Sequence, residues 1–288
     1  MPMTDQSTPA PAGNVWFRVA SVEDIALMLT WAAAEGWNPG LDDAAIFQAA
    51  DPEGFFLALE GDQPVAAISV VNHDVANAFL GLYLCRPAWR GRGIGFALWK
   101  HALTHAGGRS VGLDGVEAQQ ANYARSGFVR IGATRRWEGR LDPQSCPGVG
   151  LVADADLPRL LELDRTANGV NRPAFLKAWV QSTEHRRTVV LDRPGAFGFA
   201  TIRRCGSGGK IGPILAPDAG LALELAKAAL TELPLDRVAI DLPEANVALA
   251  DDLVSQGFVN SFTTARMFCG QAPATGPSLQ AIATMELG

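Results

Sequence analysis

The chain has 288 residues, of which 48% are hydrophobic and 19% are charged, so it can form two domains with hydrophobic cores and is not a disordered chain. No apolar run approaches the roughly 20 residues that cross a bilayer, and the polar, proline-containing start lacks the features of a signal peptide. The four cysteines show no Cys-x-x-Cys spacing. We therefore expect free thiols in a reducing, cytoplasmic setting, with no membrane partner.

The net charge of −6 is unevenly distributed along the chain. Residues 1–85 contain 1 basic and 11 acidic residues, residues 86–140 contain 10 basic and 3 acidic, and residues 141–288 contain 13 basic and 16 acidic. The three segments thus carry −10, +7 and −3. A positive block inside an acidic protein predicts a local anion-binding site, with a solvated basic surface as the alternative. A nucleic-acid partner is not expected, because nucleic-acid-binding domains are usually basic throughout.

The first part of the chain predicts a mixed sheet covered by helices, which is an α/β fold. After a flexible tail at residues 1–14, apolar periodicity and turn residues predict a strand at 15–19, a helix capped by Ser21, a helix at 42–50, strands at 54–59, 65–71 and 76–85, a helix at 93–106, a strand at 110–113, a helix at 118–126 and a strand at 129–137. Short links between the three central strands predict an antiparallel meander. The later strand–helix–strand order predicts a parallel crossover.

Prolines and glycines at 142–148 predict a linker, which divides the chain into domains at 15–141 and 149–288. The second part predicts a similar order of elements: helices at 154–164 and 173–180, strands at 188–191, 197–202 and 210–214, a helix at 221–230, a strand at 238–241, a helix at 247–255 and a strand at 262–268. The tripeptide Gly-Phe-Val at 127–129 recurs at 257–259, and Thr134 and Arg136 recur at the same spacing. These matches indicate an internal duplication.

A glycine-rich loop separates the strand at 76–85 from the helix at 93–106. It reads Cys-Arg-Pro-Ala-Trp-Arg-Gly-Arg-Gly-Ile-Gly over residues 85–95. Alternate glycines let several backbone N–H groups point at one place, and the helix that follows adds the positive end of its dipole. Arg86, Arg90 and Arg92 can neutralise phosphate charge. The pattern predicts a cradle for a pyrophosphate.

Two other phosphate-binding motifs fit this loop poorly. A P-loop requires Gly-Lys-Ser/Thr, which is absent. A dinucleotide-binding fold requires Gly-x-Gly-x-x-Gly, although Asp114 after the next strand imitates its ribose-binding acid and keeps that alternative open. A glycine-rich turn with solvated arginines is the simplest alternative.

The loop resembles the motif Gln/Arg-x-x-Gly-x-Gly/Ala of the GNAT superfamily of N-acetyltransferases, here Arg90-x-x-Gly93-x-Gly95. The preceding Cys-Arg-Pro is similar to the family's Val-x-Pro at the end of the fourth strand. A second family mark, Tyr-x-x-x-Gly-Phe, is matched from Tyr123 to Phe128. The resemblance covers about residues 15–140, and the later part resembles a degenerate second copy, as in two-domain members of the superfamily.

The resemblance implies two tandem acyl-CoA N-acyltransferase-like domains, acetyl-CoA as co-substrate, no metal, and a small-molecule amine acceptor that attacks the thioester directly. It implies that Tyr123 is the general acid that protonates the leaving thiolate; a tyrosine packed into the core is the alternative. The residues that it implies for coenzyme binding are Tyr83, Leu84, Cys85, Arg90, Gly91, Arg92, Gly93, Ile94 and Gly95. A non-catalytic acyl-CoA sensor or scaffold is the alternative function.

The acceptor site is less well marked in the sequence. The resemblance places Glu35, Trp37 and Asn38 at its border, where Glu35 can take a proton from the amine through water; an exposed carboxylate is the alternative. Asp241 is a polar residue at a strand end that can line a cleft between the domains, or serve a turn. The charge of −10 over residues 1–85 predicts a cationic amine.

The second copy lacks both family marks, and we expect it not to bind the coenzyme. Pro213 and Pro217 stand where a phosphate loop would need N–H donors. Leu253 stands five residues before Phe258, at the position of the predicted acid in the first copy. His101 and His105 are four residues apart, but without a third ligand we interpret them as surface histidines and not as a metal site.

Overall fold

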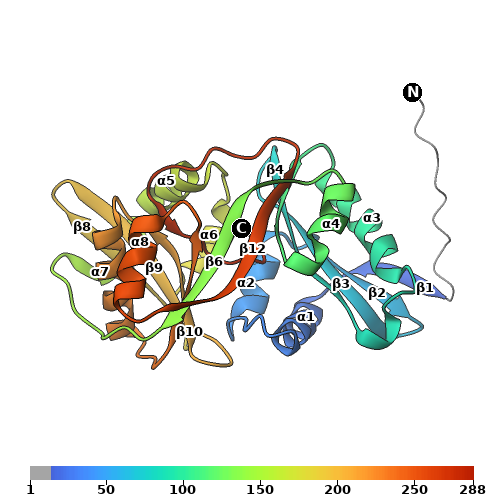
Figure 1. Cartoon of the computed structure of the whole chain (residues 1–288), viewed down its shortest axis with the longest axis horizontal. Helices are drawn as coiled ribbons and strands as arrows, with labels where there is room; N and C mark the ends of the chain where they lie inside the picture. Colours follow the sequence, from blue (N-terminus) through green and yellow to red (C-terminus); the bar gives the residue numbers. More distant parts are fainter. Residues whose placement is uncertain (1–13) are drawn as a thin grey trace.

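The computed structural model describes residues 14–288, so all but the last residue of the predicted tail lies outside it. Within this range the chain forms a mixed α/β structure on one continuous sheet of 13 strands. Figure 1 shows an elongated molecule in which two halves, each with its own helices, are joined by two long strands. The predicted fold class is confirmed.

The first half contains the predicted elements, displaced by a few residues at most. They are β1 (Val15–Val19), α1 (Val22–Ala34), α2 (Asp43–Ala50), β2 (Phe55–Glu60), β3 (Gln63–Asn72), β4 (Asn77–Cys85), α3 (Ile94–Ala106), β5 (Ser110–Gly115), α4 (Glu117–Arg125) and β6 (Val129–Gly139). Strands β1 to β4 form the antiparallel meander, and β5 is parallel to β4.

Helix α1 shows how local sequence fixes an element. Ser21 and Asp24 form a reciprocal capping box, in which the Asp24 amide donates to Ser21 Oγ and the Ser21 amide donates to the Asp24 carboxylate. The apolar positions Ile25, Met28 and Leu29 follow at helical spacing and are buried. Helices α1 and α2 pack on one face of the meander, while α3 packs on the other face.

The second half repeats this plan. Its elements are β7 (Val149–Leu151), α5 (Leu157–Asn168), α6 (Pro173–Trp179), β8 (Arg186–Arg193), β9 (Ala196–Arg204), β10 (Gly209–Leu215), α7 (Ala219–Glu232), β11 (Val238–Pro243), α8 (Val247–Ser255), β12 (Val259–Cys269) and β13 (Leu279–Ala281). The sequence missed β7 and β13 because three residues are too few for a periodic signal. It also began α5 too early, since residues 154–156 form a separate 3₁₀ turn.

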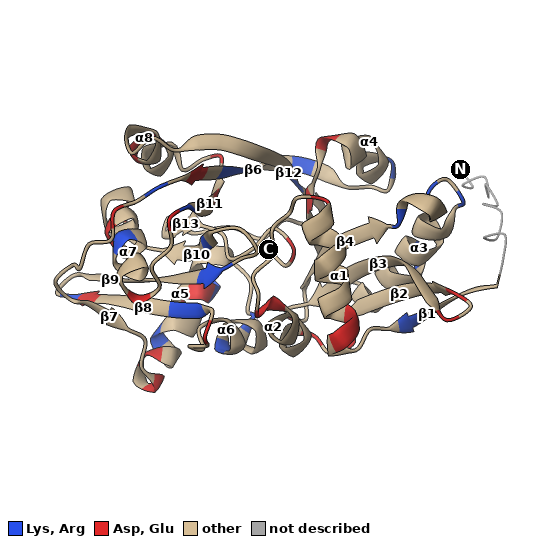
Figure 2. Ribbon diagram, turned by 90° about the horizontal axis from the view of Figure 1, so that it is seen from below, with Lys and Arg blue, Asp and Glu red and all other residues tan. Residues whose placement is uncertain are grey.

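The two halves exchange their last long strands. The strand order is β1-β2-β3-β4-β5-β12-β6-β11-β10-β9-β8-β7, so β6 of the first half lies between β12 and β11. Strand β12 of the second half in turn pairs with β5. Figure 2 shows β6 and β12 side by side across both halves, with α8 near one end and α4 near the other. The domain division between residues 141 and 149 was predicted from the local prolines and glycines. Local composition does not indicate that β6 and β12 pair with the other half.

Candidate functional site

The first half contains an opening between two parallel strands. Strands β4 and β5 are paired only from Asn77 opposite Ser110 to Leu80 opposite Leu113. Beyond that point β4 bulges away from β3, and Leu82 has a φ of 46°. A non-glycine residue in this region is strained, and a bulge redirects the backbone. The carboxyl-terminal half of β4 therefore forms one wall of an open V.

The glycine-rich loop lies at the mouth of this V and leads into α3. Gly91 and Gly93 have φ values of 76° and 77°, and no atom lies within 4 Å of where their Cβ atoms would be. Gly93 is the N-cap of α3, and no side chain caps the helix. The first amides of α3 are thus oriented toward open space with the positive end of the helix dipole. This arrangement fits a pyrophosphate.

The loop arginines make contacts that the sequence did not indicate. The Arg90 guanidinium donates to the Cys85 carbonyl at 2.8 Å and to Glu35 Oε1 at 2.6 Å. Arg92 forms an ion pair with Glu60. Both arginines are partly exposed, so these pairs can exchange with phosphate oxygens, but the donors that already point into the cleft are the backbone amides.

A cavity of about 500 Å³ runs along this loop. Eight of the nine residues predicted to bind the coenzyme line it, and Arg92 is the exception. Glu35 and Trp37 lie on its wall, together with Val116 and Gln119 at the start of α4. The structure therefore brings the predicted coenzyme residues together around one cavity.

A second, smaller pocket adjoins this cavity between the two halves. The two share Trp37, Tyr83, Val116 and Gln119 as lining residues. The inner pocket, here called the central pocket, is also lined by Tyr123 from the first half and by residues that the sequence did not indicate. The latter include Arg136, Phe262, Met285 and Glu286. No local motif marks these positions; the strand exchange and the last residues of the chain bring them there.

Tyr123 lies on α4 and lines the central pocket. Its ring stacks on Trp99, with a centroid distance of 5.4 Å and an interplanar angle of 16°, and the residue is 7% exposed. Burial, with a smaller contribution from Tyr83, raises the pKa of Tyr123 above that of free tyrosine. Burial also raises the pKa of Tyr83 to about 12. Both hydroxyls are therefore protonated at neutral pH.

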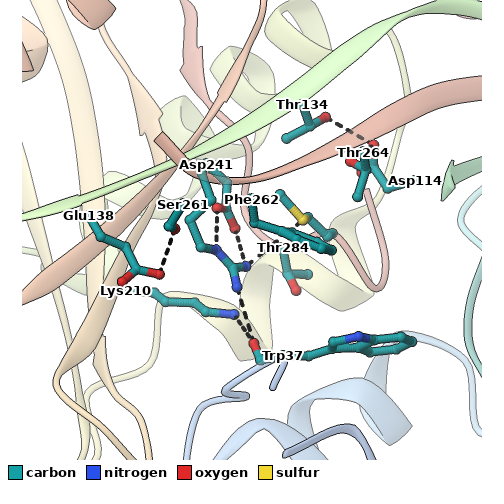
Figure 3. Close-up of polar contacts among 12 residues, drawn as sticks. Trp37, Asp114, Thr134, Glu138, Lys210, Asp241, Ser261, Phe262, Thr264 and Thr284 are labelled. Atoms are coloured by element: carbon teal, nitrogen blue, oxygen red, sulfur yellow. Dashed lines mark hydrogen bonds and ion pairs between the residues drawn. The ribbon is translucent and has the colours of Figure 1, made fainter. Parts of the chain in front are cut away.

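Trp37 and Asn38 lie where the first half meets the second. Lys210 Nζ and Arg136 Nη1 donate to the Trp37 carbonyl at 2.9 and 3.3 Å (Figure 3). The Asn38 amide group exchanges two hydrogen bonds with the backbone of Ser207, at 2.7 and 3.1 Å. The Asn38 side chain is thus occupied at the junction and is absent from the lining of the central pocket, whereas Trp37 is part of that lining.

Asp241 is 5% exposed and pairs with Arg136, which lines the central pocket. Its two oxygens accept from Arg136 Nε and Nη2, both at 2.8 Å. Burial alone would raise the pKa of Asp241, but Arg136 holds it below the ordinary value. The carboxylate is directed at Arg136 and does not line the pocket; the substrate contact assigned to it remains a prediction.

Asp114, the residue that imitates a ribose-binding acid in the sequence, is paired within the chain. It accepts from Arg266 Nη2 at 2.7 Å. It also accepts from Thr134 Oγ1 at 2.9 Å and from Thr264 Oγ1 at 3.2 Å, and Figure 3 shows these three residues together. Burial raises the pKa of Asp114, and these donors offset part of that effect. The carboxylate is saturated by the chain itself.

The chain matches known proteins over nearly its whole length. The pattern of the Acetyltransferase (GNAT) family matches residues 22–131, and that of an Acetyltransferase (GNAT) domain matches residues 160–280. Over 273 residues the chain is 35% identical to the holothin acyltransferase of Pseudoalteromonas sp. (strain SANK 73390), covering 93% of each protein. The chain belongs to the GNAT family. It carries two GNAT domains in tandem.

Solved structures show the same GNAT fold. A putative acetyltransferase from Pyrococcus horikoshii superimposes with a TM-score of 0.81 at 23% identity, covering 98% of both chains. A tandem GNAT protein from the clavulanic acid biosynthesis pathway superimposes with a TM-score of 0.62 at 19% identity, covering 90% of this chain and 100% of that one. The tandem arrangement predicted from the repeat is thereby confirmed.

The second GNAT copy has a V of its own, but the chain fills it. Strands β10 and β11 pair over only two positions. Beyond them β13 pairs with β10 through Ile214 opposite Ala281, and the Ile282 amide donates to the Asp241 carbonyl at 3.0 Å. A Cβ on Gly212 would collide with the Ile282 carbonyl. The space that corresponds to the first coenzyme cleft is thus occupied by residues 278–283.

The helix that follows β10 is capped differently from α3. The Asp218 side chain accepts from the Leu221 amide at 2.8 Å and caps α7. A carboxylate therefore takes the place that a phosphate would need. The strand predicted at 210–214 is present as β10, so Pro213 lies within a strand and only Pro217 lies in the segment between β10 and α7.

The two helix α3 histidines have separate partners. His105 Nε2 lies 2.8 Å from Asp51 Oδ2, and His101 packs against Phe17 and Phe56. Among residues 14–288 no group of three His, Cys, Asp or Glu side chains is placed to hold a metal ion. In the same range no helix is both long and apolar enough to cross a membrane.

Proposed function

We propose that the chain is an acetyl-CoA-dependent N-acetyltransferase that acetylates a small amine in the central pocket. The observation that carries this proposal is the junction of two spaces. The cavity along the glycine-rich loop meets the central pocket at Tyr83, and Tyr123 lines the central pocket beside that junction. A thioester in the first space and an amine in the second would meet beside a protonated phenol.

The cavity along the loop fits the coenzyme. The uncapped amides of α3, with Arg90 and Arg92 beside them, would hold the pyrophosphate. The backbone of Tyr83, Leu84 and Cys85 would hold the pantetheine arm along the unpaired part of β4. A backbone N–H near the bulge at Leu82 would polarise the thioester carbonyl, which stabilises the developing oxyanion.

The reaction needs a neutral amine and a protonated leaving group. The amine nitrogen attacks the thioester carbon, the C–N bond forms and the C–S bond breaks. Tyr123 gives its proton to the departing sulfur, a step for which its raised pKa keeps it protonated beforehand. Direct transfer requires no acyl-enzyme, and Cys85 has no adjacent base that would make it a nucleophile.

We propose a cationic amine as acceptor. The acidic excess of residues 1–85 supports this, since that segment supplies Trp37 and Tyr83 to the pocket walls. Glu35 is a candidate to accept a proton through water, although its ion pair with Arg90 first gives it a role in holding the loop. The 35% identical relative is named for acyl transfer to holothin, so holothin belongs among the first acceptors to be tested.

A thiol-release assay tests the proposal. The protein is incubated with acetyl-CoA and, separately, with longer acyl-CoA thioesters, against holothin and a panel of basic, neutral and acidic amines. We expect thiol release that depends on the acceptor, and mass spectrometry should show an acceptor heavier by one acetyl group. Tight coenzyme binding without transfer to any amine would instead support a sensor or scaffold. Preferred transfer to acidic acceptors would contradict the proposal that the acceptor is a cationic amine.

A further inference from the structure

The last residues of the chain connect the two GNAT copies. Residues 278–288, here called the strap, leave the filled V of the second copy and continue to the open V of the first. There a Cβ on Gly81 would collide with the Glu286 carbonyl, and His73 Nε2 lies 2.7 Å from the Leu287 carbonyl. The label C in Figure 1 lies between the two halves, in agreement with this course. The strap therefore contacts β4 next to its bulge.

The strap places one carboxylate in the wall of the central pocket. Glu286 is 5% exposed and lines that pocket together with Tyr123. Thr284 Oγ1 donates to Glu286 Oε2. Among the described residues no donor is within hydrogen-bond distance of Oε1. This oxygen is not fully buried either, so it is open to the pocket. One oxygen is thus fixed by Thr284 while the other remains accessible.

The other carboxylates near the reaction space each have an arginine partner. Asp114, which also lines the central pocket, accepts four hydrogen bonds, two from Arg266 and one each from Thr134 and Thr264. Asp241 is paired with Arg136 through both oxygens. Glu35 lies on the coenzyme cavity and is bound by Arg90. Glu286 is the described carboxylate of the central pocket that keeps an oxygen for a ligand.

We propose that Glu286 is the group that binds the acceptor ammonium and removes its proton. The inference rests on the proposed function and adds the base that this function requires. A largely buried carboxylate with one free oxygen favours a cation as its partner, because an unpaired charge in such a pocket is costly. The acceptor nitrogen would then lie between Glu286 and the thioester beside β4.

The proton balance is complete without a further reactant. The ammonium gives one proton to Glu286, directly or through one water, and becomes the nucleophilic amine. Attack on the thioester carbon forms the C–N bond, and the nitrogen then loses a second proton, which returns to Tyr123 through water after Tyr123 has protonated the departing sulfur. Glu286 releases its proton to solvent, so one proton is released per amide formed.

Charged groups from several elements surround Glu286. Its charge contributes to the raised pKa of Arg136 on β6, and it opposes the larger effect of burial, which lowers the pKa of Lys210 on β10. Arg136 is compensated by Asp241 on β11. On the opposite side of the pocket, Asp114 on β5 is compensated by Arg266. Lys210 donates to the Trp37 carbonyl and has no carboxylate within ion-pair distance among the described residues, so it is the remaining cation on the Glu286 side of the pocket.

The test compares Glu286→Gln with wild type and with Glu162→Gln. The glutamine keeps the size of the side chain and its bond to Thr284, while Glu162 is an exposed residue paired with Arg165 on α5. With acetyl-CoA and the best amine of the panel, we expect kcat/KM of Glu286→Gln to fall about 10²-fold or more. Its pH profile should also lose the acidic limb that wild type and Glu162→Gln retain. Coenzyme affinity, measured by calorimetry, should not change.

The outcomes separate this inference from the proposed function. If the wild-type protein acetylates no amine, both the proposed function and the role of Glu286 are wrong. If the wild type is active, and kcat/KM of Glu286→Gln is within threefold of it with the acidic limb of the pH profile intact, only the role of Glu286 is wrong. If Glu286→Gln does not fold, Glu286→Asp is measured instead. The proposed role requires that this shorter carboxylate lowers kcat/KM relative to wild type and retains the acidic limb of the pH profile. Full activity of Glu286→Asp would overturn the role.

Discussion

Arg136 on β6 and Asp241 on β11 form a doubly hydrogen-bonded ion pair, with both N–O distances at 2.8 Å, although they are 105 residues apart. Arg266, at the repeat position of Arg136, forms the corresponding pair with Asp114 on β5. The arginine of each exchanged strand thus forms an ion pair with an aspartate of the other half. Thr134 and Thr264 lie opposite each other between the two pairs. The strand exchange is held by a pair of reciprocal ionic contacts.

Removing one partner of this buried pair should destabilise the protein strongly. Asp241→Asn leaves the Arg136 charge, which is 5% exposed, without its countercharge. We expect a loss of about 3–5 kcal/mol in the free energy of unfolding, measured by urea denaturation at pH 7. Glu162→Gln, which breaks the exposed pair with Arg165, is the control and should cost at most about 1 kcal/mol. Equal losses in the two variants would show that burial of the first pair is unimportant.

Gly93→Ala tests the anion cradle. Gly93 has a φ of 77°, and its added methyl would enter the open space in front of α3. We expect coenzyme A to bind at least about tenfold more weakly, which corresponds to roughly 1.4 kcal/mol. Gly195→Ala is matched to it, since Gly195 has a φ of 79° with equal free space but lies in the β8–β9 turn. Calorimetric titration of both variants should show a loss for Gly93→Ala alone.

Tyr123→Phe tests the proton donor. The change removes one hydroxyl and keeps the ring stacked on Trp99, so the melting temperature and coenzyme affinity should stay the same. We expect kcat to fall about 10²-fold or more, because the thiolate would leave unprotonated. Steady-state kinetics with Tyr83→Phe provide the comparison. A larger loss of kcat in that variant, with Tyr123→Phe near wild type, would assign the proton to Tyr83.

Each chain should bind one coenzyme A. Residues 278–283 fill the second V, and the Asp218 carboxylate caps the helix where a phosphate would bind. An anion placed there would meet the negative charge of Asp218, which already accepts from the Leu221 amide. Calorimetry with coenzyme A should therefore give a stoichiometry near one per chain. A value near two, or coenzyme density between β10 and β11 in a crystal, would refute this account of the second copy.

His73 should make stability depend on pH. Burial is the main cause that lowers the pKa of His73 to about 4, and the charge of Arg172 is the second cause. In an unfolded chain the pKa is about 6.5. The unfolded state therefore binds a proton first as the pH falls. Stability is fully present above about pH 6.5 and declines toward pH 4, on the order of 1–3 kcal/mol.

His73→Gln is the matched variant for this pH dependence, since its amide can still donate to the Leu287 carbonyl. Urea unfolding of wild type and His73→Gln at pH 7, 6, 5 and 4 measures the difference in slope. We expect the variant to lose less stability than wild type between pH 6.5 and 4. Parallel curves would mean that His73 does not titrate differently in the folded and unfolded states.

The sequence by itself determined every α-helix and strand except the short strands β7 and β13, together with the glycine-rich loop and the position of Tyr123. These features depend on local causes. Ser21 caps the helix that follows it, Gly91 and Gly93 adopt positive φ values, and Tyr123 stands at a fixed spacing before Phe128. The sequence also indicated the duplication, because the two copies retain the residues that end α4 and α8 and form the strands that follow.

Only the tertiary structure decided which strands are neighbours and which side chains form the central pocket. Strand β6 could pair within its own half or with β11, and the backbone hydrogen bonds are alike in both arrangements. The choice depends on contacts across more than 100 residues, such as Arg136 with Asp241. Glu286 reaches the first copy for the same reason. Residues 279–282 pair with β10 and β11 of the second copy, and only the folded chain brings the Glu286 carboxylate into the same pocket as Tyr123.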